Sequence, residues 1–282
     1  EIMPSLVGSE MCIRDRIMKV VESAQYYVDD IKKGERTKKA PLPFTTSTLQ
    51  QEASKVLNFA TQKTMRIAQQ LYEGIDIKGS GTVGVITYLR TDSTRISAEA
   101  DANAREYIAQ NYGENYVSAV AKKADDGKKI QDAHEAIRPT DITRTPATLK
   151  DSLTRDQFRL YQLIWKRFAA SRMNPAKYET TSIKIAAGEY RFSVAASKNV
   201  FEGFRAVYVE SDEEKEENNV LVKSIDKDSK LTKEELEPKQ HFTQPPAHYT
   251  EASLVKALEE LGIGRPSTYA PTISTIIARR YV

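Results

Sequence analysis

Cysteine and histidine are scarce in this chain, and long hydrophobic runs are missing. Its 282 residues include a single cysteine, Cys12, and three histidines, His134, His241 and His248. So few ligands exclude a disulfide framework and a Cys/His zinc site. No hydrophobic run approaches the roughly 18 residues of a membrane span. With 29% charged and 40% hydrophobic residues, the chain is expected to be a globular protein of the reducing cytoplasm, without a membrane partner.

An excess of one charge is also lacking, since 42 basic and 39 acidic residues leave a net charge of +3. That balance is too small by itself to indicate a nucleic-acid partner. The distribution is uneven, because residues 210–240 hold eleven acidic and six basic residues, which leaves +8 elsewhere. This acidic stretch has no hydrophobic period and is expected to be a solvated loop. The basic cluster at residues 32–39 is either a phosphate-contacting strip or an exposed strand end.

The length predicts two domains or one large multi-lobed one. Residues 1–16 lack the basic and hydrophobic regions of a signal peptide and look like a translated sequencing adapter, so a non-native prefix is expected there. Periodicity and capping residues predict helices from Ser47 and over 61–73, 97–113, 157–170, 250–261 and 267–279. Alternating and β-branched segments predict strands over 26–33, 83–89, 180–185, 190–195 and 206–210. The last three strands would form a small antiparallel sheet.

A glycine-rich segment, GSGTVG at residues 79–84, matches the GxGxxG dinucleotide-binding fingerprint. That fingerprint works only between a strand and a helix, whose first N–H groups then face a pyrophosphate. A strand is predicted to follow here, so nucleotide binding is rejected and a loop is expected.

A tyrosine and an arginine lie two residues apart in ITYLRTDST at residues 86–94. Because alternate residues of a strand share a face, Tyr88 and Arg90 are expected to point the same way. A tyrosyl oxygen can attack a phosphodiester while a guanidinium binds the phosphate oxygens. With an unperturbed pKa near 10, only about one tyrosine in a thousand is ionised at pH 7, a handicap of roughly 4 kcal/mol that positive neighbours must offset. On spacing alone, an ordinary half-buried strand tyrosine is the competing interpretation.

A second polar group, HEAIRP at residues 134–139, brings His134, Glu135 and Arg138 within about one helical turn. A zinc protease site is excluded because no second histidine follows four residues after the first. The three side chains suit a phosphate contact or proton transfer. An ordinary turn with local salt bridges would use the same residues.

The C-terminal segment is predicted to be a helix, a glycine-containing turn and a second helix, with GRPSTY at residues 264–269 between them. Arg265, the hydroxyls of Ser267 and Thr268, and the first N–H groups of the second helix would make an anion site. The helix-turn-helix spacing also indicates DNA. A plain helical hairpin with Ser267 as the N-cap is the alternative.

Four segments together resemble bacterial type IA DNA topoisomerase I, in the order of that family. They are PFTTSTLQQ at residues 43–51, ITYLRTDST at 86–94, HEAIRP at 134–139, and EASLVK through GRPSTY at 251–269. The resemblance covers about residues 17–282 and implies an α+β, mainly helical fold, the toroidal type IA core lacking its Toprim domain. It also implies three domains: a β-rich arch (17–39 and 175–240), a helical gate (40–174) and the start of a DNA-binding base (241–282).

In that family a tyrosine cuts one DNA strand, forms a 5′-phosphotyrosine and lets the other strand pass before religation. The resemblance assigns this catalytic role to Tyr88, with Arg90 holding the scissile phosphate. It assigns DNA binding to a further set: Asp92, His134, Arg138, Arg265, Ser267 and Thr268. It implies relaxation of negatively supercoiled DNA without ATP, by a monomeric, nucleoid-associated enzyme of the bacterial cytoplasm that binds single-stranded DNA.

The family's Toprim domain supplies the Mg²⁺ ligands and a general acid, and neither this domain nor the C-terminal zinc ribbons is expected in this chain. No metal site is therefore predicted here, and the fragment alone is expected to be inactive. Two other classes stay open: a non-catalytic DNA-binding module, supported by the C-terminal helices, and the core of a reverse gyrase. A tyrosine recombinase or type IB enzyme is disfavoured, because its tyrosine would lie on a helix near the C-terminus.

Overall fold

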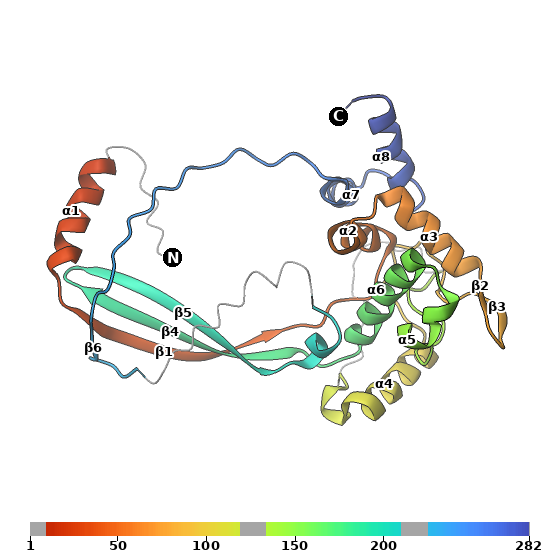
Figure 1. Ribbon diagram of the computed structural model, residues 1–282, viewed down its shortest axis with the longest axis horizontal. Helices are drawn as coiled ribbons and strands as arrows, with labels where there is room; N and C mark the ends of the chain where they lie inside the picture. Colours follow the sequence, from red (N-terminus) through yellow and green to blue (C-terminus); the bar gives the residue numbers. More distant parts are fainter. Residues whose placement is uncertain (1–9, 119–133, 210–224, 282) are drawn as a thin grey trace. The chain divides into compact units, whose positions relative to one another are not determined.

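The computed structural model describes residues 10–118, 134–209 and 225–281. The chain divides into two compact units, whose elements are labelled in Figure 1. Unit 1 comprises Glu1–Lys38, Lys177–Phe201 and Lys215–Pro246, and unit 2 comprises Lys39–Ala176, Glu202–Glu214 and Ala247–Val282. The naming of parts of these units as arch, gate and base stays a prediction. Within the described ranges, no helix is both long and apolar enough to cross a membrane.

Unit 1 is built on a four-stranded sheet with the order β5-β4-β1-β6. Its strands are β1 (Tyr26–Lys38), β4 (Ala176–Ala187), β5 (Tyr190–Phe201) and β6 (Lys230–Leu231). β4 and β5 form an antiparallel hairpin, and β6 pairs antiparallel with β1. The predicted strands at 26–33, 180–185 and 190–195 are thus confirmed, each in a longer form.

A helix precedes this sheet. α1 (Glu10–Ser23) includes residues 10–16, which are part of the expected non-native prefix. That residues 1–16 are a non-native prefix stays a prediction.

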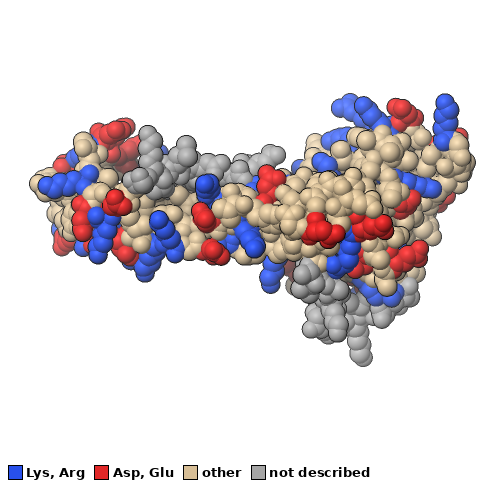
Figure 2. Space-filling model, turned by 90° about the horizontal axis from the view of Figure 1, so that it is seen from below, with Lys and Arg blue, Asp and Glu red and all other residues tan. Residues whose placement is uncertain are grey.

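The basic cluster at residues 32–39 lies in and just after β1. Lys32, Lys33 and Arg36 are exposed, as both of its interpretations require. The Arg36 guanidinium lies over the Tyr178 ring, 4.8 Å from its centroid. Figure 2 shows basic side chains interspersed with acidic ones on the visible face, and the cluster stays a candidate for phosphate contact.

Unit 2 is helical and carries Tyr88, Arg90 and all the residues that the resemblance assigns to DNA binding. Its helices are α2 (Thr46–Leu57), α3 (Thr61–Glu73), α4 (Ala98–Tyr112), α5 (Pro146–Leu149), α6 (Arg155–Ser171), α7 (Glu251–Glu260) and α8 (Tyr269–Ala278), with short 3-10 turns η1 (Glu114–Tyr116), η2 (Lys150–Ser152) and η3 (Gly203–Ala206). The longer helices confirm the predicted ones, and the short α5 was not predicted. A hairpin of β2 (Ile75–Ile77) and β3 (Gly81–Val83) contains the glycine-rich segment. The glycine-rich segment therefore holds the turn and the second strand of a hairpin, and no helix begins directly after it, which agrees with the rejection of a nucleotide site.

One predicted strand, at 206–210, is wrong over its described part. The chain instead makes the 3-10 turn η3, in which the buried Phe204 donates its N–H to the Asn174 carbonyl at 3.0 Å. Gly203 permits this turn, because its φ is +52° and a Cβ there would clash with the carbonyls of residues 174 and 175.

The core of unit 2 is organised around α6. The apolar stripe of this helix consists of Phe158, Tyr161, Ile164, Trp165 and Phe168, and all but the half-buried Phe158 are buried. This helix packs against α2, α3 and α5. Full burial of a large apolar side chain stabilises a fold by about 1.5–3 kcal/mol. The stripe is therefore part of the hydrophobic core, and the loops that carry the site are anchored to this helix.

Candidate active site around Tyr88

The segment that carries Tyr88 is not a regular strand and bends at Leu89 and Arg90, so the predicted strand at 83–89 is wrong after Val83. Only an isolated bridge joins Ile86 to Pro139. The Thr87 N–H donates to the Arg138 carbonyl at 2.9 Å, but the Arg138 N–H donates to the Thr87 hydroxyl at 3.0 Å. In a continuing antiparallel ladder, that N–H would bond the Thr87 carbonyl instead. The hydroxyl therefore ends the ladder one residue before Tyr88.

The alternation of a strand nevertheless persists through this segment. Leu89, Thr91 and Ser93 are buried, with 0%, 3% and 2% of their surface exposed. Tyr88 is half-buried, whereas Arg90 and Asp92 are exposed. Of residues 88–93, Tyr88, Arg90 and Asp92 are therefore the ones that solvent can reach.

Two rings border Tyr88. The His134 ring lies 4.8 Å from it, centroid to centroid, at an interplanar angle of 43°. The Tyr72 ring, at the C-terminal end of α3, approaches edge-on at 5.5 Å and 70°. The fold thus brings the first residue of HEAIRP beside the tyrosine of ITYLRTDST.

Tyr72 was not singled out from the sequence. It comes close because Gly84 lets the segment run against the end of α3: a Cβ at Gly84 would lie 2.5 Å from the Tyr72 carbonyl oxygen. The next N–H, of Val85, donates to the Leu71 carbonyl at 2.9 Å. The glycine four residues before Tyr88 was the available signal of a close backbone approach.

Arg138 is buried, unlike a freely exposed DNA contact. Its Nε donates to Glu135 Oε2 at 2.8 Å, and its Nη1 donates to the Pro139 carbonyl at 2.9 Å. Burial alone would raise the pKa of the Glu135 carboxyl, but hydrogen bonds from Arg138 and Ser97, with the Arg138 charge, lower it below its usual value. The local salt bridge that the sequence left open therefore forms, and it occupies donors that a phosphate would need.

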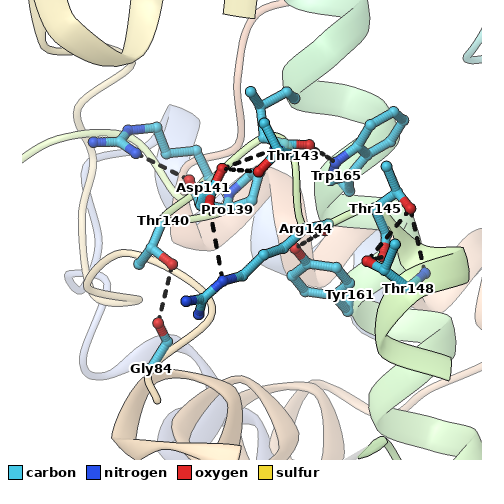
Figure 3. Close-up of polar contacts among 12 residues, drawn as sticks. Gly84, Pro139, Thr140, Asp141, Thr143, Arg144, Thr145, Thr148, Tyr161 and Trp165 are labelled. Atoms are coloured by element: carbon cyan, nitrogen blue, oxygen red, sulfur yellow. Dashed lines mark hydrogen bonds and ion pairs between the residues drawn. The ribbon is translucent and has the colours of Figure 1, made fainter. Parts of the chain in front are cut away.

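The loop after Pro139 is anchored to α6 (Figure 3). Tyr161 donates its hydroxyl to the Arg144 carbonyl at 2.6 Å, and Trp165 Nε1 donates to the Ile142 carbonyl at 2.9 Å. The Thr140 hydroxyl donates to the Gly84 carbonyl at 3.0 Å. These bonds connect the buried face of α6 to the start of the Tyr88 segment.

The C-terminal motif differs in detail from the expected anion site. Arg265, Ser267 and Thr268 are exposed, but α8 begins at Tyr269, and Ser267 is not its N-cap. The N–H groups of Thr268 and Tyr269 both donate to the Arg265 carbonyl, at 2.8 and 3.3 Å. Pro271 has no N–H to offer. Two backbone donors of the predicted cradle are thus already used, and a third does not exist.

The start of α8 nevertheless lies near the Tyr88 segment. Burial raises the pKa of Tyr269, the charges of Glu259 and Asp92 raise it further, and the charge of Arg265 opposes them. Asp92 therefore acts electrostatically on a residue of α8. α7 packs on α2, and α8 packs on α3, within the same unit.

A magnesium site does not fit the residues at hand. No three His, Cys, Asp or Glu side chains in the described ranges are grouped so that they could hold a metal ion. The Mg²⁺ that the resemblance implies therefore has no ligand set among the described residues.

Comparison with known proteins identifies the class. Residues 9–282 match the family model described as DNA topoisomerase. The structure is similar to that of full-length topoisomerase I from Thermotoga maritima in a monoclinic crystal form, with a TM-score of 0.80 and 38% sequence identity, over 98% of this chain and 44% of that one. The chain therefore belongs to the DNA topoisomerase family. Within that family it is a bacterial type IA topoisomerase, and it spans less than half of the length of the Thermotoga protein.

Proposed function

We propose that Tyr88 is the nucleophile of a DNA strand-passage reaction. The observation that carries this proposal is the solvent access of Tyr88, Arg90 and Asp92 in one anchored segment, with His134 against the Tyr88 ring. The tyrosyl oxygen attacks phosphorus and loses its proton, the bond from phosphorus to the 3′-oxygen breaks, and that oxygen leaves with a proton. A 5′-phosphotyrosine results, and religation reverses the step. Because the ester conserves the bond energy, ATP is not required.

In this proposal Arg90 binds the scissile phosphate. Its guanidinium offers bidentate contacts to the phosphate oxygens, and its charge stabilises the negative charge that develops in the transition state. His134 contacts the DNA beside Tyr88. Asp92, Arg138, Arg265, Ser267 and Thr268 complete the DNA-binding set, in which Arg138 acts through the Glu135 pair rather than as an exposed contact.

The substrate that we propose is the single-stranded part of negatively supercoiled DNA, relaxed by a monomer at the bacterial nucleoid in the cytoplasm. The relaxation depends on Mg²⁺, whose ligands we expect in a Toprim domain. The 282-residue chain by itself is therefore expected to be inactive.

The test uses the intact protein that carries this sequence, with a 3′-labelled single-stranded oligonucleotide. Label is expected to transfer covalently to the wild type and to the control Tyr190→Phe, whose hydroxyl lies in unit 1, but not to Tyr88→Phe. Transfer to Tyr88→Phe, or a labelled peptide without Tyr88, would contradict the proposal. In a parallel plasmid assay with Mg²⁺, the 282-residue chain should relax no more DNA than its own Tyr88→Phe variant.

A further inference from the structure

A buried hydroxyl from another element holds the residues on both sides of Arg90. Thr46 is the first residue of α2 and is fully buried. Its hydroxyl donates to the Leu89 carbonyl at 2.7 Å and accepts the Thr91 N–H at 2.9 Å. Its own N–H donates to the Thr91 carbonyl, also at 2.9 Å. One residue thus satisfies three backbone groups next to the proposed phosphate-binding arginine.

The helix that contains Thr46 does not need this hydroxyl. The N-cap of α2 is Thr45, whose hydroxyl accepts a hydrogen bond from the Thr48 N–H at 3.3 Å. The Thr48 hydroxyl in turn accepts a hydrogen bond from the Thr45 N–H at 2.9 Å. This reciprocal capping box satisfies the start of the helix. The Thr46 hydroxyl is therefore committed to the segment 89–91, about 45 positions away in the sequence.

The other side of Tyr88 is held by a different partner. The Thr87 hydroxyl donates to the Ala136 carbonyl at 2.7 Å and accepts the Arg138 N–H at 3.0 Å. Tyr88 thus lies between two anchored neighbours. Of the two anchors, only the Thr46 hydroxyl acts on the residues that flank Arg90.

We propose that Thr46 is a positioning residue of the DNA-cleavage site. Its hydroxyl fixes the backbone at residues 89–91 so that Tyr88 and Arg90 can contact the same phosphate. This inference rests on the proposed role of Tyr88. Reacting groups must be held within about 0.5 Å of their productive geometry, and a displacement of about 1 Å can cost roughly 10²-fold in rate. Without the hydroxyl, the buried Leu89 carbonyl and Thr91 N–H lose their partner and the segment must rearrange to satisfy them.

Thr46→Val removes the hydroxyl at nearly constant shape, and Thr46→Ser keeps it. Thr64→Val is the matched control, because Thr64 is also fully buried and its hydroxyl bonds only a helix carbonyl, that of Ala60, at 3.1 Å. In the intact protein, we expect single-turnover adduct formation at saturating oligonucleotide to fall about 10–100-fold in Thr46→Val. The oligonucleotide Kd should change less than about twofold, and Thr46→Ser should restore the rate.

A second measurement does not depend on catalysis. Hydrogen exchange followed by mass spectrometry should show faster exchange in peptides covering residues 88–92 of Thr46→Val, with α6 unchanged, and neither Thr46→Ser nor Thr64→Val should show this local effect. Unchanged exchange at 88–92 overturns the clamp, and faster exchange with an unchanged adduct rate overturns its positioning role. A wild type that forms no Tyr88 adduct contradicts the proposed function instead, and a rate lost equally in Thr46→Ser assigns the effect to packing and overturns the inference.

Discussion

At the scale of the residue, the Glu135–Arg138 salt bridge holds together the segment that follows His134. The side chains are 24% and 11% exposed, and the arginine also bonds the Pro139 carbonyl. A buried charge that loses its partner is costly, so each member constrains the other. The pair therefore constrains the segment that directly follows His134.

This pair predicts a pH dependence of stability. Because the pKa of Glu135 is lower in the folded state, its contribution is fully present above the unfolded value of about 4.3 and is lost as the pH falls through the folded pKa. Glu135→Gln should lower the free energy of unfolding at pH 7, and this difference from the wild type should shrink toward pH 3. Urea unfolding at pH 7, 4 and 3 measures it, with the exposed Glu106→Gln as control. A difference that stays constant across this range would contradict the linkage.

At the scale of the element, the N-terminus of α3 is capped by a residue far away in the sequence. Its N-cap position, Ala60, has no side chain that can accept a bond. The Thr61 N–H instead donates to Glu251 Oε2 of α7 at 2.7 Å. A carboxylate at a helix N-terminus also interacts favourably with the helix dipole. α7 therefore caps α3 while it packs on α2.

Loss of this cap should be measurable. Glu251→Ala is expected to lower the free energy of unfolding by about 1–2 kcal/mol, in the range of other N-cap losses. Glu251→Gln should cost less, because its amide oxygen still accepts the bond. Chemical denaturation measures both, against Glu260→Ala, whose carboxylate is exposed in a 3.8 Å pair with Lys256. Equal effects of Glu251→Ala and Glu260→Ala would show that the cap contributes nothing.

Elements of this kind also show what the sequence can predict. The prediction of a helix over 157–170 came close to the observed α6 because its apolar periodicity is a local signal, although the cap at Thr154 that starts the helix was not recognised. That Tyr88 and Arg90 point the same way, as a period of two would require, stays a prediction. The end of the ladder, the burial of Arg138 and the approach of Tyr72 could not be predicted, because each depends on a partner that only the folded chain brings near.

At the scale of the whole molecule, the two units differ in how much they bury. The largest fully buried side chains, among them Tyr161, Phe44, Phe168 and Phe204, all belong to unit 2. The fully buried side chains of unit 1 are smaller, and its buried residues include Val28 and Ile183. Since hydrophobic burial is the dominant favourable contribution to folding, unit 2 should be the more stable of the two.

Calorimetry should therefore resolve two transitions, with unit 1 unfolding at the lower temperature. Ile183→Ala should shift only the first transition and Leu160→Ala only the second, each losing about 2–5 kcal/mol. The exposed fractions of these side chains are 4% and 0%. A single transition that both variants shift would show that the units unfold as one.

The Thr87 hydroxyl has a consequence for redesign. Threonine ranks among the residues most favoured in strands, yet here its oxygen takes the Arg138 N–H that a ladder would use. A propensity-guided replacement by valine would free that N–H for the Thr87 carbonyl, but it would also remove the bond from the hydroxyl to the Ala136 carbonyl. The substitution that a strand scale scores as an improvement would thus remove a side-chain link between the neighbour of Tyr88 and the segment that carries His134.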